Sequence, residues 1–238
     1  MIDVRYFNLA TRTGRRRSIE LQARLHRLDA VRIEGFGPHA GAERALPQSR
    51  IGSSGARALL ATWHLRLRAI AEHGARDAAT WLVLLEDDAV LAPGFRRRTM
   101  AVLDAAPDDC LLVQLGFLSK YTWFGSRRQW INVAMAGLYV VRGEWRRSAR
   151  LRGGGSDPTF STEMLSGSQA VAVRVATIPT LVELLEPYEL VTDDLFRSRA
   201  ERHPGRFLRH RRQLAIQAPC FRSDLRPERP GSSSLRNG

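Results

Sequence analysis

The sequence feature that most constrains the fold is a short apolar run that ends in three acids. Residues 81–85 read Trp-Leu-Val-Leu-Leu, and Glu86, Asp87 and Asp88 follow at once. A run without polar alternation predicts a strand buried on both faces, as in parallel sheets covered by helices. In open α/β sheets, ligands bind just beyond the carboxyl ends of the strands. The acids therefore predict a charged site at the end of this strand.

Apolar periodicity elsewhere predicts strands that alternate with helices. Strands are expected at residues 2–9, 31–34, 111–115, 138–141 and 169–175, and helices at 15–28, 59–74 and 95–106. This order is typical of an α/β fold with a Rossmann-like, mostly parallel sheet and helices on both of its faces. A Gly-, Pro- and Ser-rich stretch at residues 35–56 predicts a long loop.

Positive charge is concentrated near the C-terminus. The 238 residues carry a formal net charge of +13, and residues 195–238 hold 11 arginines and three acids. We expect one domain over residues 1–194 and a basic, partly disordered tail over residues 195–238. Phe207, Leu208 and Leu214 lie among the arginines of this tail. This amphipathic pattern favours peripheral contact of residues 200–238 with an anionic membrane surface.

The cysteine content and the lengths of the apolar runs indicate the cellular compartment of the protein. Two cysteines do not form a disulfide framework, so a reducing compartment is expected. The apolar runs are too short to span a bilayer, and the N-terminus has no apolar signal core. We therefore expect a cytoplasmic protein, with peripheral contact at the inner face of the membrane.

The three acids have oxygen ligands suited to Mg²⁺ or Mn²⁺. Side chains two residues apart in an extended segment point the same way, so Glu86 and Asp88 are expected to face one site while Asp87 faces elsewhere. Even with the buried strand before them, a solvated loop is an equally good interpretation of the three acids. Two other function classes also stay open: a metal-dependent phosphohydrolase or nuclease that uses the same acids, and a basic nucleic-acid-binding protein. The chain has no recognised nucleic-acid motif, so no specific nucleic acid is expected as a partner.

Residues 85–91, Leu-Glu-Asp-Asp-Ala-Val-Leu, resemble the Leu-Glu-Asp-Asp motif of glycosyltransferase family 25. This family includes bacterial lipooligosaccharide galactosyltransferases and collagen hydroxylysine galactosyltransferases. Tyr-Phe-Asn-Leu at residues 6–9, with the arginines that follow, resembles the family's opening Asn-Leu and arginine cluster. Residues 136–141 and 178–182 resemble the family's later Tyr-containing strand and Pro-x-Leu segment. The resemblance covers about residues 3–194.

The resemblance implies a GT-A fold and a bacterial hexosyltransferase of lipopolysaccharide biosynthesis. The implied reaction is an inverting, metal-assisted transfer of a hexose from a UDP-sugar to a saccharide or other cell-envelope acceptor. Galactose is the expected hexose. Mn²⁺ or Mg²⁺ would be bound by Asp88 with Glu86. The nucleotide pocket would be formed by Asn8, Leu9, Arg12, Arg15, Glu86 and Asp87.

An inverting transfer also needs a base that deprotonates the acceptor hydroxyl, and a carboxylate suits that role. The candidates are Glu163 and Asp157. Glu163 lies near the position of a later family Asp. For each of these two residues, the alternative interpretation is a surface acid without a catalytic role.

Overall fold

The structure is a computed structural model that describes residues 1–35, 63, 67–72, 79–117, 159–165, 167–186, 190 and 192–217. Its N-terminal half contains β1 (Ile2–Asn8), α1 (Thr13–Leu25), β2 (Ala30–Glu34), β3 (Trp81–Glu86), β4 (Ala89–Leu91), α4 (Phe95–Asp104) and β5 (Leu112–Gly116). Its C-terminal half contains β6 (Phe160–Ser161), β7 (Ala170–Arg174), a 3-10 turn (Val175–Thr177), α6 (Ile178–Leu185), α7 (Thr192–Arg202), β8 (Phe207–His210) and β9 (Ala215–Gln217). The strand expected at 138–141 and all but the first residue of the expected loop at 35–56 lie outside the described residues.

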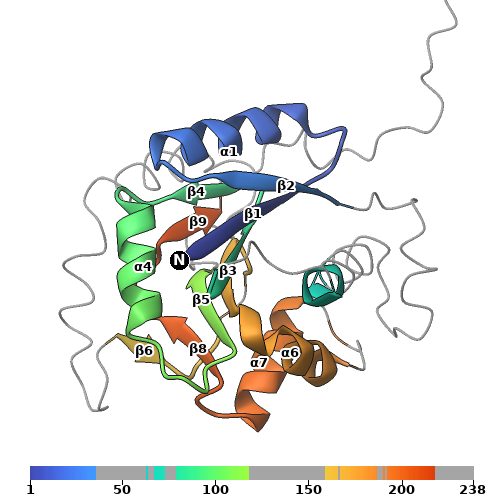
Figure 1. Cartoon of the computed structure of the whole chain (residues 1–238), viewed down its shortest axis with the longest axis vertical. Coiled ribbons are helices and arrows are strands. Elements are labelled where there is room, and N and C mark those ends of the chain that lie inside the picture. Colours follow the sequence, from blue (N-terminus) through green and yellow to red (C-terminus); the bar gives the residue numbers. More distant parts are fainter. Residues whose placement is uncertain are drawn as a thin grey trace, which may run out of the picture.

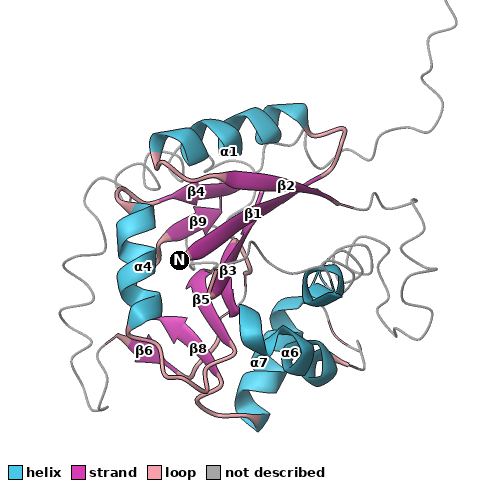
Figure 2. Cartoon of the chain, viewed as in Figure 1, coloured by secondary structure: helices cyan, strands magenta, loops and turns pink. Residues whose placement is uncertain are grey.

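The strands form one mixed sheet (Figure 2). Its main path runs β2-β1-β3-β7-β5-β8-β6, and β9 pairs with both β4 and β5. β2, β1 and β3 are parallel, as are β5 and β8, whereas β7 runs antiparallel to both β3 and β5. The expected α/β class is confirmed, and β2, β1, β3, β5 and β8 share one direction. The reversed β7 in the middle of the sheet was not predicted, because an apolar pattern carries no information on strand direction.

The uniformly apolar β3 is covered by helices on both faces. Trp81, Val83 and Leu85 belong to a core that includes buried residues of α1 and α4. Leu82 and Leu84 belong to the opposite core, with buried residues of α6 and α7. Figure 1 shows these two pairs of helices on different sides of the sheet. Because both sets of side chains leave water, this strand has no polar alternation.

The expected boundary at residue 194 is wrong for residues 195–217, which are part of the sheet and its helical cover. Phe207 and Leu208 lie in β8, beside β5, and both are buried. Leu214, just before β9, is also buried. These three side chains formed the apolar part of the expected membrane-binding pattern, so they are not available to a membrane. The short elements interrupted by arginines hid the core residues from periodicity analysis.

Gly116 allows the late strand β9 to lie against β5. A Cβ atom at this position would lie 2.8 Å from the carbonyl oxygen of Ala215 and 3.1 Å from the backbone nitrogen of Ala170. Both obstacles are backbone atoms, so a side chain at residue 116 would push the strands apart. The close approach lets β9 reach β4 and brings Gln217 beside the acids that follow β3.

Candidate functional site

The carboxyl ends of β1 and β3 meet at one edge of the sheet. Their parallel register pairs Phe7 with Glu86, so Asn8 lies next to the acids. The Asn8 side-chain amide is buried and donates hydrogen bonds to Asp87 Oδ2 at 2.7 Å and to the Arg12 carbonyl at 3.1 Å. Asn8 therefore ties the end of β1 to both the acids and the start of α1.

The first turn of α1 brings Arg15 onto the acids. Leu9 and Arg12 form the turn that leads into the helix, in which the Arg12 backbone N–H donates to the Leu9 carbonyl at 2.9 Å. From the helix, Arg15 Nη1 lies 3.2 Å from Asp87 Oδ1 and 3.2 Å from Asp88 Oδ2. One guanidinium nitrogen thus contacts both carboxylates.

α1 is fixed over the sheet by two side chains farther along the helix. The Tyr6 hydroxyl of β1 donates to Glu20 Oε1 at 2.7 Å. The Gln22 amide donates to the Ala89 carbonyl at 3.0 Å and accepts from the Leu91 backbone N–H at 2.7 Å. These bonds hold the helix against β1 and β4, so the position of Arg15 is set by packing as well as by charge.

Asp88 is the most buried acid of the site, with 8% of its surface exposed. Burial raises the pKa of its carboxyl group above the usual range, and the nearby Asp87 carboxylate adds to this rise. Arg15 and a hydrogen bond from Gln217 Nε2 at 3.2 Å act in the opposite direction. Asp88 Oδ1 and Asn8 Oδ1 are buried and have no hydrogen-bond partner in the described part of the chain. The site therefore contains buried oxygen atoms that a ligand would satisfy.

The prediction that Asp87 faces away from Asp88 is wrong. Glu86 Oε1 accepts a hydrogen bond from the Ser168 hydroxyl at 2.5 Å, and the Glu86 backbone N–H donates to the Gln169 carbonyl. Asp88 instead shares Arg15 with Asp87. The strand ends at Glu86 and the next two residues form a turn, so the strand alternation that the prediction assumed no longer applies.

Of the two candidate bases, the structure describes only Glu163. Its side chain is 76% exposed and lies 3.9 Å from Arg209 Nη2 of β8. Its carbonyl also accepts a hydrogen bond from Arg209 Nε at 2.8 Å. Glu163 follows β6, and β6 is the last strand of the sheet order that begins with β2 and β1. Among the described residues, no hydrogen bond or ion pair joins Glu163 to the acids, and Asp157 lies outside the described residues.

Sequence reasoning missed Ser168 and Gln217. Ser168 is followed by Gln169 and then by the apolar strand β7, and both polar residues are buried. A polar pair directly before an apolar strand was therefore an available signal. Gln217 gave no such signal, because it lies in a basic segment without periodicity. Its contact with Asp88 depends on pairing between β4 and β9.

The candidate metal ligands at this site are the carboxylate oxygen atoms of Asp87 and Asp88. Among the described residues, no group of three or more His, Cys, Asp or Glu side chains is arranged to hold a metal ion.

The described helices include none that is long and apolar enough to cross a membrane.

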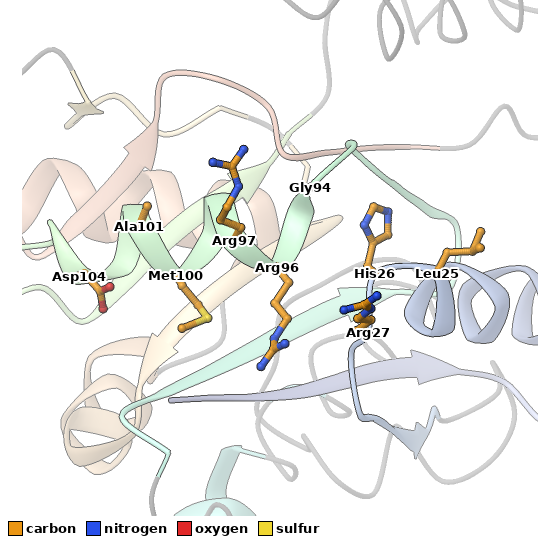
Figure 3. A pocket seen from close by; sticks show the side chains of 9 residues that line it. All are labelled: Leu25, His26, Arg27, Gly94, Arg96, Arg97, Met100, Ala101 and Asp104. Atoms are coloured by element: carbon orange, nitrogen blue, oxygen red, sulfur yellow. The ribbon is translucent and has the colours of Figure 1, made fainter.

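A cavity of about 620 Å³ lies at the other end of α1, between its last turn and α4 (Figure 3). Three arginines, Arg27, Arg96 and Arg97, line it together with His26 and a single acid, Asp104. Burial lowers the pKa of His26 below the usual range. Leu25 lies ten residue steps beyond Arg15, which places this cavity about 15 Å along the helix from the contact of Arg15 with the acids. With one carboxylate it lacks paired acids, so we place the candidate site at Asp87 and Asp88.

Comparison with known proteins finds similarity only in structure. No family model matches the chain, and no curated protein matches it in sequence. One similar structure is a glycosyltransferase involved in glycosylation of the major capsid of PBCV-1, with 10% identity and a TM-score of 0.46, covering 94% of this chain and 96% of that one.

Two further similar structures are also glycosyltransferases. Glucosyl-3-phosphoglycerate synthase from Mycobacterium tuberculosis, in complex with Mn²⁺, UDP-glucose and phosphoglyceric acid, is 14% identical with a TM-score of 0.44, covering 94% of this chain and 74% of that one. Mouse xyloside xylosyltransferase 1 is 12% identical with a TM-score of 0.40, covering 87% and 71%. Because these TM-scores lie below 0.5, the function of this chain has to follow from its own residues.

Proposed function

We propose that the chain is an inverting glycosyltransferase that moves a hexose from a UDP-sugar to a saccharide or other cell-envelope acceptor. Galactose is the hexose that we expect. The observation that carries this proposal is the meeting of Asn8, Arg15, Asp87 and Asp88 at the carboxyl ends of β1 and β3. This edge is where α/β sheets bind ligands. The resemblance of residues 6–9 and 85–91 to family 25 supports the sugar-transfer class.

The site residues fit a divalent cation such as Mn²⁺ or Mg²⁺. Asp88 Oδ1 is a buried carboxylate oxygen without a hydrogen-bond partner among the described residues, and oxygen is the ligand that these cations prefer. Asp88 and Asp87 would hold the ion, and Glu86 is a weaker candidate because Ser168 already donates to it. When bound, the cation would stabilise the charge that develops on the leaving diphosphate.

The protein's own residues would bind and orient the donor. Arg15 has the planar guanidinium that suits phosphate oxygens, and Arg12 follows the same strand end. Asn8 and Gln217 hold Asp87 and Asp88 in place by hydrogen bonds. A diphosphate would therefore enter a site in which both acids are already oriented, which lowers the entropic cost of binding.

The test is a screen for hydrolysis of nucleotide sugars without an acceptor. We expect UDP release from a UDP-hexose in the presence of Mn²⁺, and a fall of about 100-fold or more in Asp88→Asn, since a few kcal/mol of transition-state stabilisation is lost. Asp104→Asn is the matched control, because this exposed acid lines the remote cavity and should leave the rate unchanged.

Other outcomes of this screen separate the competing classes. Release of inorganic phosphate or cleavage of an oligonucleotide, without UDP release, would identify a phosphohydrolase or nuclease. Oligonucleotide binding that is unaffected by Asp88→Asn, with no UDP binding, would identify a nucleic-acid-binding protein. Full UDP release by Asp88→Asn would show that the acids are not the catalytic site.

We also propose Glu163 as the base that takes the proton of the acceptor hydroxyl. Its exposed carboxylate is accessible to a large acceptor, and Arg209 is the cation nearest to it in the described structure. Glu163→Gln should lower transfer by about 100-fold or more and leave the affinity for UDP unchanged. Glu183→Gln on α6 is a control for loss of one negative charge. Transfer at the wild-type rate in Glu163→Gln would exclude this role.

A further inference from the structure

The contact between Arg15 and the two aspartates has a consequence for cation binding. Arg15 Nη1 lies 3.2 Å from one oxygen of Asp87 and 3.2 Å from one oxygen of Asp88. A single positive nitrogen between two carboxylates has the position and the sign of charge of a bound cation. A divalent ion held by these two carboxylates, at these oxygens or at the unpartnered Oδ1 of Asp88, would lie beside the positive charge of Arg15, where repulsion is strong.

We propose that Arg15 is the resident counter-ion of Asp87 and Asp88, and that a divalent cation binds this pair by displacing the Arg15 guanidinium. The proposal rests on the proposed function only for the identity of the donor that would later occupy the site. The competition itself is between Arg15 and the cation for Asp87 and Asp88, and it does not involve the donor.

The surroundings of the three side chains permit this exchange. The Arg15 side chain is 25% exposed, against 12% for Asp87 and 8% for Asp88, so the arginine has the most direct route to water. Hydrogen bonds from Asn8 to Asp87 Oδ2 and from Gln217 to Asp88 Oδ2 do not involve Arg15. Both carboxylates therefore keep a neutral donor when the arginine leaves.

The exchange also accounts for the charge of the site. Asp88 is buried and the neighbouring Asp87 carries the same charge, so the pair needs a nearby positive charge in every state of the protein. Arg15 provides that charge when no ion is bound. Once displaced, its guanidinium becomes available to an anionic ligand at the edge of the sheet.

The test measures Mn²⁺ binding in the absence of nucleotide, by calorimetry, in the full-length chain. Arg15→Gln removes the competing charge and should bind Mn²⁺ about tenfold or more tightly than the wild type. Arg15→Lys keeps the charge and should stay within about threefold of the wild type. Arg16→Gln is the matched control, because Arg16 pairs with Glu20 at 2.8 Å in the same helix and should change nothing.

A second measurement uses the wild-type chain with Mg²⁺, which does not broaden NMR signals. The Arg15 side-chain ¹⁵Nε resonance, assigned by its absence in Arg15→Lys, should move on saturation with Mg²⁺ toward the position of a solvated arginine. This NMR measurement tests the displacement of Arg15 even if the Arg15→Gln protein does not fold.

Three results would overturn the proposal. They are equal or weaker Mn²⁺ binding by Arg15→Gln, an Arg15 resonance that Mg²⁺ leaves unchanged, and the absence of cation binding in every variant. None of these readouts involves UDP or sugar transfer. Failure of the glycosyltransferase proposal would instead be seen as absent UDP release with the Arg15 results intact.

Discussion

At the residue scale, Asp88 combines a buried charge with a set of specific neighbours. Only 8% of its surface is exposed, and it lies beside a second carboxylate. Burial raises its pKa, which means that the folded protein disfavours the charged form. A residue that costs stability in its charged state and is nevertheless held by Arg15 and Gln217 is typical of a functional site.

This raised pKa gives a prediction for stability. The contribution of Asp88 to the free energy of unfolding is largest at acid pH, where the carboxyl is neutral, and it is lost as the pH rises through the raised pKa. Asp88→Asn should therefore be at least as stable as the wild type at about pH 7 and lose any advantage near pH 4. Urea unfolding at both pH values measures this difference.

The control for this comparison is Asp104→Asn, which should change stability by less than about 0.5 kcal/mol because the side chain is exposed. An Asp88→Asn protein that is less stable than the wild type by more than about 1 kcal/mol at neutral pH would contradict the sign of the effect. It would mean that the pairing with Arg15 outweighs the cost of burying the charge.

At the element scale, β9 is the late strand that completes the site. It pairs with β4 and β5, and its last residue, Gln217, donates to Asp88. This arrangement depends on Gly116 of β5, where backbone atoms of β9 and β7 leave no room for a Cβ atom. A short strand near the end of the chain thus positions a carboxylate that follows β3.

Gly116→Ala tests this dependence. The added methyl group would meet the Ala215 carbonyl at 2.8 Å, so the strands must separate. We expect a loss of about 1–3 kcal/mol in the free energy of unfolding and weaker binding of UDP with Mn²⁺. Gly14→Ala on α1 is the matched control, since a Cβ atom there meets nothing within 4 Å and a helix favours alanine. Equal stability and UDP affinity in Gly116→Ala would show that β9 is not held by this contact.

At the scale of the whole molecule, local patterns predicted the strands β1, β2, β3, β5 and β7 and the helices α1 and α4, and they predicted that the polar residues of the proposed site lie together. The run Trp81–Leu85 predicted a strand buried on both faces, and the polar residues after it and after β1 do lie together. These inferences succeeded because each depends on residues that are close in sequence.

The unpredicted features depend on residues that are distant in sequence. The direction of β7, the contact of Ser168 with Glu86 and the contact of Gln217 with Asp88 follow from strand pairing, for which a single sequence has no signal. The turn at Asp87 and Asp88 ended the alternation that was expected to pair Glu86 with Asp88. The segment after residue 194 was taken for a tail because its core residues are separated by arginines.

We propose that Asp87 and Asp88 form the centre of a site for a nucleotide diphosphate and its cation. A crystal structure with UDP and Mn²⁺, in which anomalous scattering locates the metal, tests this proposal. We predict an Mn²⁺ peak at about 2.0–2.3 Å from a carboxylate oxygen of Asp88, a metal–oxygen bond length, with the diphosphate beside it at the ends of β1 and β3. UDP and Mn²⁺ bound elsewhere, for example in the arginine-lined cavity between α1 and α4, would contradict it.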